Sequence, residues 1–531
     1  MKKTFKYIFT LFLAGSLSSC GEEFFDSARQ QSNIASDRWG STQDLERLIA
    51  GAYYGISSYE GFRGIHGLQM VHEALMSDIG LLHTAGVTDD WQTDVYNRRN
   101  ARNDIPLYAW MWRGAYQGAA LANEVIGWIE TNGAFKDQQG PVWTDRILGE
   151  AYFLRAWIYF TMVRIHGPAY GANNSAPSII LNITPSKEGF ANPPRASVEA
   201  VYAQILKDLE NAVRLLPETY NAQRDPIDYQ DRAQRDAARF LLARVHFQMK
   251  NFAKAKEMCD AIISGGRFNL SEAPIEAWNK TGTGQRGREV VWQYVQFNTA
   301  QQQWKSSPVG SYLGFQARGN NNINGGRTIS ASDAFLSAVG WTPSTFQITA
   351  LPSGRPPAVL GNGNNFVISG NPDLRLQQLW RAIPAGFDPR AEYTSYNRTF
   401  VWCNKWNRTP TGVNNNLFSL PFMRLAEIHL TRSIIRFREG DRNGAAEDLN
   451  IVRRRAGLPA IAAANLTEND IHTERMRELA FEEDRTYYLQ ALNLSIPAGD
   501  REGAAPLPWN APNFAMPVPA IEADLNPSVR N

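Results

Sequence analysis

Two neighbouring helices joined by a very short turn restrict the fold more than any other feature of the chain. Apolar residues recur with the helical period over 237–249 and again over 252–263, with only Lys250-Asn251 between them. Ala243 and Ala255 stand twelve residues apart, and larger apolar or thiol side chains follow. This spacing of small residues is typical of a tetratricopeptide repeat, whose two helices pack closely at those positions.

The same pattern recurs near the end of the chain. Helices are expected over 424–438 and 442–454, where Ser433 and Ala445 take the two small positions. The helical period predicts four further amphipathic helices, the last beginning at the N-cap residue Ser197: 44–54, 109–129, 146–165 and 197–217. The chain is therefore predicted to be mostly α, with tetratricopeptide-like helical pairs that form a right-handed solenoid scaffold.

A long stretch of different composition separates the two repeats. Residues 266–420 are rich in Gly, Asn, Pro, Ser and Thr, with short strand-like segments at 290–294 and 400–403. A loop of this length inside a compact domain is expected only where it is functional or packed on a scaffold. We therefore expect a single domain over 43–531, in which a helical scaffold (43–265 and 420–495) carries a loop-rich, ligand-facing layer.

The N-terminal residues predict export and lipidation. Residues 1–19 resemble a signal peptide, because three lysines precede an apolar stretch too short to span a bilayer. Leu17-Ser18-Ser19-Cys20 follows the pattern of a bacterial lipobox, in which the cysteine thiol takes a diacylglycerol. Cys20 is thus predicted to be the acylated residue, with 20–42 as its tether. The alternative is an ordinary secretory signal with an incidental cysteine.

Composition argues against several classes of function. The 531 residues carry a formal net charge of +2, without the basic patch expected of a nucleic-acid-binding protein. His72-Glu73 lacks the second histidine of a zinc-protease motif, and no EF-hand or phosphate-binding loop is present in the sequence. No cofactor or metal is therefore predicted. Besides Cys20, the chain has Cys259 in a helix and Cys403 in a strand, either as two buried free thiols or as one disulfide.

Five segments resemble, in order, the motifs of the SusD/RagB family of outer-membrane nutrient-binding lipoproteins from Bacteroidetes. They cover nearly the whole chain: Glu150 to Trp157 with Gly167-Pro168; Arg195 to Tyr202 with Asp208-Leu209; Leu425 to Leu430 with Ala446 to Asn450 and Val452 to Pro459; Glu474-Arg475, Glu478 to Glu482 and Arg485; and Pro517 to Pro519 with Glu522 to Pro527. One departure is clear, because Glu483-Asp484 replaces the usual Gly-His before Arg485.

The resemblance implies a function as well as a fold. Family members are generally non-catalytic and sit as a lid on a SusC-like, TonB-dependent outer-membrane transporter. They capture an oligosaccharide, or in some members a peptide, and deliver it to that transporter. The acidic residues after Cys20 resemble a surface-export signal, which favours a lipid-anchored protein on the outer membrane that faces the cell exterior.

Two groups of residues need separate interpretations. The motif residues Arg155, Arg424 and Arg485, with Glu150, Glu427 and Glu482, are expected to form buried structural ion pairs. Ligand contacts are expected from aromatic and amide residues in loops, because a sugar ring offers an apolar face and a polar rim. The candidates are Trp91, Asn97, Trp304, Tyr312 and Trp341, whereas Trp110, Trp112, Trp128 and Trp157 are expected in the core.

Two other functions remain open on the sequence alone. The chain could be a hydrolase or lyase that degrades glycans on a helical fold, which a turnover assay would reveal. It could also be a tetratricopeptide scaffold that binds a peptide on its concave face, in which case the loop aromatics would be dispensable. The export signal and the long loop-rich layer favour the nutrient-binding function.

Overall fold

The computed structural model describes most of the chain after the N-terminal tether. The described residues are 39–57, 64–83, 91–99, 102–135, 140–185, 192–220, 232–278, 286–294, 329–350, 366–385, 398–405 and 420–530. The predicted lipidation site Cys20 and the predicted ligand contacts Trp304 and Tyr312 lie outside them. Among the helices so described, none is long and apolar enough to cross a membrane.

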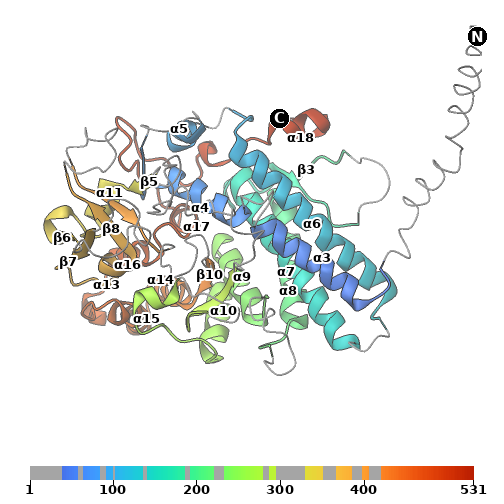
Figure 1. Cartoon of the computed structure of the whole chain (residues 1–531), viewed down its shortest axis with the longest axis horizontal. Coiled ribbons are helices and arrows are strands. Elements are labelled where there is room, and N and C mark those ends of the chain that lie inside the picture. The colour runs from blue at the N-terminus through green and yellow to red at the C-terminus, as the bar shows by residue number, and fades with distance from the viewer. Residues whose placement is uncertain are drawn as a thin grey trace, which may run out of the picture.

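A row of helices forms the scaffold (Figure 1), and each helix packs on the next one along the row. The helix α14 packs on α10, so the chain returns to the same row after the inserted segment. The row consists of α3 (Thr42–Ser57), α6 (Pro106–Asn132), α7 (Gly140–His166), α8 (Val198–Leu215), α9 (Arg235–Gln248), α10 (Phe252–Ser264), α14 (Leu425–Arg438) and α15 (Arg442–Arg455). All eight predicted helices are therefore confirmed, with ends that differ by a few residues.

Local sequence explains where these helices begin and how they pair. The Ser197 hydroxyl accepts a hydrogen bond from the Ala200 N–H at the start of α8, as an N-cap should. In the second repeat the Ser433 hydroxyl donates to the Ala445 carbonyl at 2.8 Å, so α14 and α15 touch at the two small residues. Ala243 and Ala255 are likewise fully buried in the first repeat. The tetratricopeptide-like pairing is confirmed at both places.

The inserted segment contributes strands as well as loops. Antiparallel pairs β1–β5, β9–β8 and β7–β6 lie side by side, since β5 also contacts β9 and β7 contacts β8. We call this the strand layer, and Figure 1 shows it at the end of the molecule away from α3, α7 and α8. Its strands are β1 (Gly80–Leu82), β5 (Ile329–Ala331), β6 (Gln347–Ala350), β7 (Phe366–Ser369), β8 (Trp380–Ile383) and β9 (Phe400–Cys403). The predicted strand at 400–403 is confirmed.

Shorter elements complete the chain. The predicted strand β4 (Val290–Tyr294) is confirmed and pairs with β10 (Leu420–Arg424), which leads directly into α14. Apart from two helices near the start of the chain, which are described next, the other elements are β2 (Pro177–Ile180), β3 (Arg195–Ser197), α11 (Asp333–Ala338), α13 (Leu374–Leu379), α16 (Glu468–Leu479), α17 (Arg485–Ala491), α18 (Ala520–Leu525) and the 3-10 turns Pro274–Ala277, Pro343–Thr345, Ala463–Asn465, Pro512–Phe514 and Pro527–Val529.

Two helices in the first part of the chain were not predicted. The candidate contacts Trp91 and Asn97 were expected to lie in a loop. Instead, α4 (Ile65–Met76) is a helix in which every residue is buried, and α5 (Trp91–Tyr96) is a short helix that contains Trp91. The polar residues His66, Gln69, His72 and Glu73 recur at helical spacing along α4, so the sequence does carry a signal for this helix, although the fold buries these residues as well.

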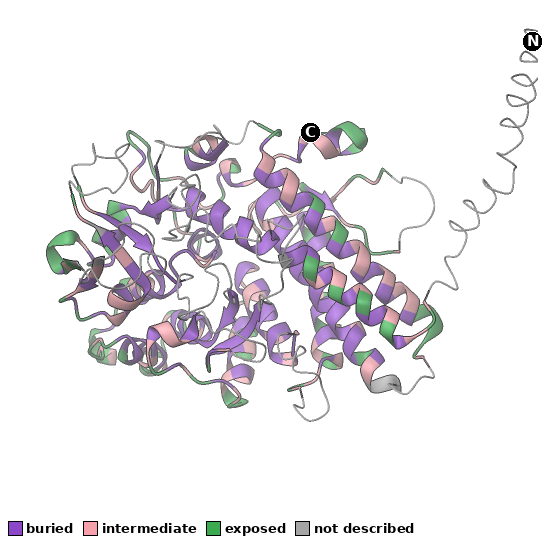
Figure 2. Cartoon of the chain, viewed as in Figure 1, coloured by how far each residue is buried: buried purple, intermediate pink, exposed green. Residues whose placement is uncertain are grey.

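One continuous core joins the helices to the strand layer, as the buried faces in Figure 2 show. Trp112 and Trp157 are buried in this core, and Trp110 and Trp128 pack against it, which confirms the interpretation of these four residues. Cys259 and Cys403 are both buried free thiols. Burial raises the pKa of the Cys403 thiol to about 12, so it stays protonated.

Candidate ligand-binding face

The strand layer has an aromatic outer face that is separate from the main core. Side chains alternate between the two faces of a strand. In β9, Val401 and Cys403 point into the main core, whereas Phe400 and Trp402 form a second cluster with Leu81 of β1. In β8, the Trp380 ring packs into the core, so Arg381 points to the outer face.

His83 links these rings to the strands beneath them. Its imidazole stacks on the Trp402 ring with centroids 4.9 Å apart, and meets the Phe400 ring edge-on at 4.8 Å. Its Nε2 lies 2.8 Å from the Ser330 hydroxyl on β5, which fixes the ring orientation. We call Leu81, His83, Phe400 and Trp402 the outer aromatic group.

The outer aromatic group is largely buried, but one of its hydrogen-bond donors has no acceptor. Trp402 is only 4% exposed, yet its indole N–H has no hydrogen-bond acceptor. A buried indole N–H normally finds an acceptor, because leaving it unpaired costs about 1–3 kcal/mol. Such orphan donors are rare in native proteins, although the core residue Trp380 has one as well, so what distinguishes Trp402 is its place on the outer face.

Charged residues border the outer aromatic group. The Arg398 guanidinium lies over the Phe400 ring at 4.9 Å and pairs with Asp333 at the start of α11. Asp500 accepts hydrogen bonds from the Asp333 and Ala334 N–H groups at 2.7 and 2.9 Å. On the other side, Arg381 is the direct cross-strand neighbour of Trp402. The face therefore combines ring surfaces with polar groups at its rim.

The helix α5 contacts β1 and brings two predicted contacts to this part of the molecule. Trp91 begins α5 and is 2% exposed, whereas Asn97 directly follows the helix and is exposed. Trp341 is different, because it is 1% exposed and its ring lies 5.7 Å from Trp380 and 5.9 Å from Phe335. The Trp341 ring therefore packs in the core, apart from the outer aromatic group, and its interpretation as a ligand contact stays a prediction.

Buried arginines hold α5 and β1 in place from below. Arg98 donates to the Met76 carbonyl at 2.9 Å and to Pro497, and Arg501 donates to the Ser77 carbonyl at 2.9 Å. These cations lie at the C-terminus of α4, where the helix dipole favours positive charge. Burial lowers the pKa of Arg98 to about 9. The end of α4 and the end of α5, next to β1, are thus held by contacts to residues about 400 positions further along the chain.

The charged motif residues are structural, as expected, but most of their partners differ from those expected. Arg424 does pair with Glu482, at 2.7 Å. Arg155 instead makes a two-pronged pair with Asp208, and Arg485 makes one with Asp78. Glu150 and Glu427 pair with other arginines, Arg146 and Arg232 for the first and Arg244 for the second. Spacing along the chain identifies only Arg146–Glu150, which are four residues apart on α7, because the other contacts join residues distant in sequence.

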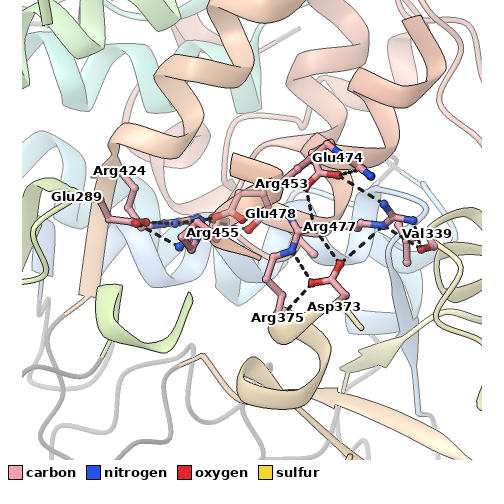
Figure 3. A network of polar contacts seen from close by, with 12 residues as sticks. Glu289, Val339, Asp373, Arg375, Arg424, Arg453, Arg455, Glu474, Arg477 and Glu478 are labelled. Carbon is pink, nitrogen blue, oxygen red and sulfur yellow. Dashed lines mark hydrogen bonds and ion pairs between the residues drawn. The ribbon is translucent and has the colours of Figure 1, made fainter. Parts of the chain in front are cut away.

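Arg424 is one part of a larger buried network that ties α13, α15 and α16 to β10 (Figure 3). Glu289 accepts from Arg424 at 2.6 Å and from Arg455 at 3.1 Å. Glu478 accepts from Arg424 at 2.8 Å and from Arg375 at 3.2 Å. With every cation facing carboxylates, the network serves to register the elements and leaves no group available for a ligand.

Glu483-Asp484, the departure from the family motif, fills a buried turn. Glu483 has φ 59°, a left-handed conformation that glycine adopts without strain, which explains the glycine of the usual motif. Its carboxylate accepts from Arg244 at 3.1 Å, and Asp484 takes a two-pronged bond from Arg475. Burial raises the pKa of Glu483 to about 7. A small polar cavity of about 30 Å³ beside these residues has room for a water molecule or two.

Sequence reasoning predicted the strand that carries the aromatic group but not the group itself. His83, Phe400, Trp402 and Arg381 were not singled out, because each motif that drew attention was either a family signature or a loop. The alternation in Phe400-Val401-Trp402-Cys403 was the available signal, since a strand with large rings on one face and small apolar side chains on the other must pack against something on each. Within the described residues, no group of three His, Cys, Asp or Glu side chains could hold a metal ion.

Comparison with known proteins shows which families have sequences similar to this chain. Residues 31–247 match the family model described as starch-binding and associating with the outer membrane, and residues 288–489 match the SusD family model. SusD-like protein P2 of Formosa agariphila is 26% identical over 240 residues, which are 44% of this chain and 42% of that relative.

Solved structures agree with the chain over nearly its whole length. A SusD superfamily protein from Bacteroides thetaiotaomicron superposes with a TM-score of 0.72 at 17% identity, covering 92% of this chain and 99% of the other. Surface glycan-binding protein A from Bacteroides uniformis superposes with a TM-score of 0.67 at 18% identity, covering 92% and 98%. The structural likeness establishes the shared fold, and the two family models together span more than three quarters of the chain. The chain therefore belongs to the SusD family.

Proposed function

We propose that this protein is a non-catalytic surface lipoprotein that captures a glycan and hands it to a TonB-dependent outer-membrane transporter. The observation that carries the proposal is the outer aromatic group on the strand layer, with its unpaired indole N–H and its polar rim. Aromatic rings beside a few fixed polar groups are what a sugar requires of a binding site. The name of the Bacteroides uniformis relative, a surface glycan-binding protein, supports the same substrate class.

Trp91 and Asn97 lie on or beside α5, which borders β1, and they stay predicted contacts. Trp304 and Tyr312 also stay predicted contacts and lie outside the described residues. Cys20 remains the predicted anchor, and a SusC-like transporter the predicted partner. A peptide in place of the oligosaccharide is the alternative ligand.

A binding screen tests the proposal. The lipid-free protein, residues 21–531, is titrated by calorimetry and affinity electrophoresis against panels of plant, host and microbial oligosaccharides and peptides. We expect saturable binding of one glycan class without turnover, and loss of binding in Trp402→Ala. The matched control is Trp128→Ala, which removes a partly buried indole stacked on Phe135 far from the strand layer. Circular dichroism confirms that both variants are folded.

Each other outcome changes a defined part of the proposal. Release of shortened sugars would show an enzyme, and peptide binding would change the substrate class. Glycan binding that survives Trp402→Ala would move the site away from the outer aromatic group. Copurification of the full-length, lipidated chain with a TonB-dependent transporter tests the partner, and a chain that always purifies alone from gently solubilised membranes would contradict it.

A further inference from the structure

Arg381 differs from the other arginines of the strand layer because it lacks an anionic partner. Among the described residues, no carboxylate lies within ion-pair distance of its guanidinium, and its one hydrogen bond goes to the Trp380 carbonyl at 2.8 Å. The side chain is nevertheless partly buried, and burial lowers the pKa of Arg381. By contrast, its neighbour Arg398 pairs with Asp333, although both of those side chains are far more exposed.

Most buried arginines elsewhere in the described chain have their donors occupied. Arg375 and Arg424 each face several carboxylates. Arg98 and Arg501 have no carboxylate contact, but each donates to two or more backbone carbonyls. A guanidinium has five N–H donors, and Arg381 uses one of them. Among the described residues, Arg164 also lacks an ion pair, but its guanidinium lies against the Phe160 and Tyr487 rings, whereas Arg381 lies on the outer face of the strand layer.

A second orphan donor lies directly beside Arg381. The two antiparallel strands place Arg381 opposite Trp402, so both side chains leave the same face of the layer about 5 Å apart at Cβ. The Trp402 indole N–H, buried and without an acceptor, is next to a cation whose donors are also unfilled. The acceptors in the neighbourhood are already in use, since Ser330 contacts His83 and Asp333 pairs with Arg398.

Among the described side chains, this corner offers unfilled donors and a positive charge, and its two acceptors, Ser330 and Asp333, already have partners. A neutral sugar hydroxyl both donates and accepts, so it would leave its own donor unmatched here. A carboxylate or a sulfate ester only accepts, and a guanidinium binds either group through two parallel hydrogen bonds. We propose that the outer aromatic group binds an acidic glycan, whose carboxylate or sulfate lies against Arg381 and the Trp402 N–H. This inference rests on the proposed function and specifies its substrate class.

Matched pairs of acidic and neutral glycans test the inference and separate the two sources of charge. One arm compares oligogalacturonate with its carboxyl-reduced counterpart, and the other compares a carrageenan oligosaccharide with its desulfated counterpart. We expect the protein to bind the acidic member of one pair at least about tenfold more tightly, as for a hydrogen bond to a charged group. Added salt should reduce that preference.

Substitution of Arg381 then assigns the preference to this residue. Arg381→Gln should bring the acidic and neutral ligands of the pair to similar affinity, and Arg381→Lys, which keeps the charge but loses the planar fork, should retain part of the preference. Arg454→Gln is the matched control, because Arg454 is an exposed arginine on α15 outside the strand layer. The lysine variant keeps the test decisive if the glutamine variant does not fold.

The outcomes distinguish this inference from the proposed function. Equal binding of acidic and neutral glycans, or a preference that persists in both Arg381 variants, would overturn the acidic-glycan inference and leave glycan capture intact. A protein that binds no glycan in either arm, nor in the wider screen, would overturn glycan capture and the inference with it.

Discussion

At the scale of single residues, the buried titratable groups are the positions with the clearest physical consequences. Glu73 on α4 accepts a hydrogen bond from the Thr486 N–H at 3.0 Å, whereas its second oxygen has no partner. Burial, with the nearby carboxylates of Asp78 and Asp484, raises the pKa of Glu73 to about 8. The folded protein therefore holds a proton on Glu73 at neutral pH, which the unfolded chain does not.

The elevated pKa of Glu73 makes stability depend on pH with a definite sign. Between about pH 4.5 and pH 8 the folded state binds the extra proton, so stability falls as the pH rises through that window. Glu73→Gln keeps the acceptor for Thr486 but cannot ionise. We expect the free energy of unfolding of this variant to rise relative to that of the wild type from pH 5 to pH 8. The difference should reach on the order of 3 kcal/mol at pH 8.

Urea unfolding at pH 5, 6.5 and 8 measures this difference in free energy of unfolding. The control is Glu447→Gln, which changes an exposed glutamate on α15 and should shift stability equally at all three values. Wild-type and Glu73→Gln curves that run parallel across the pH range would show that Glu73 is already ionised in the folded protein.

At the scale of elements, close helix contacts at small residues hold the scaffold together. Ala255 on α10 is fully buried where α10 meets α9, and Ala253 on the same helix is exposed. Ala255→Leu forces extra methylene groups into this contact, which should cost about 1–3 kcal/mol of stability. Ala253→Leu adds the same atoms on the solvent side. Chemical unfolding of the two variants should separate them, and equal stability would mean that α9 and α10 do not pack through Ala255.

The elements that the sequence predicted are those with an amphipathic period. Helices such as α8 and α15 expose one face to water, so their apolar residues repeat visibly. The helix α5 has six residues, too few for such a pattern, and α4 has polar residues at helical spacing that the fold nevertheless buries. The candidate face could not be predicted in the same way. Trp341 and Trp402 look alike in sequence, and only the folded structure shows that the Trp341 ring enters the core while the Trp402 ring lies on the outer face.

At the scale of the whole molecule, buried arginines join the two ends of the chain. Arg485 on α17 makes a two-pronged pair with Asp78, at 2.9 and 3.0 Å, across a separation of 407 residues. Arg98 and Arg501 lie close enough for the Asp78 carboxylate to act on both. The Asp78 carboxylate thus acts on all three buried cations, and it stands between α4 and β1.

Asp78→Asn tests whether the molecule depends on this one charge. The amide keeps the size of the side chain but removes the carboxylate that pairs with Arg485, which should cost about 3–5 kcal/mol. Asp524→Asn, which removes an exposed partner of Arg530, should change little. Urea unfolding measures both. Because β1 follows Asp78 by two residues, glycan affinity should fall with stability in Asp78→Asn. Full stability in this variant would mean that the backbone carbonyls alone satisfy the three arginines and that the two ends of the chain are held together by packing.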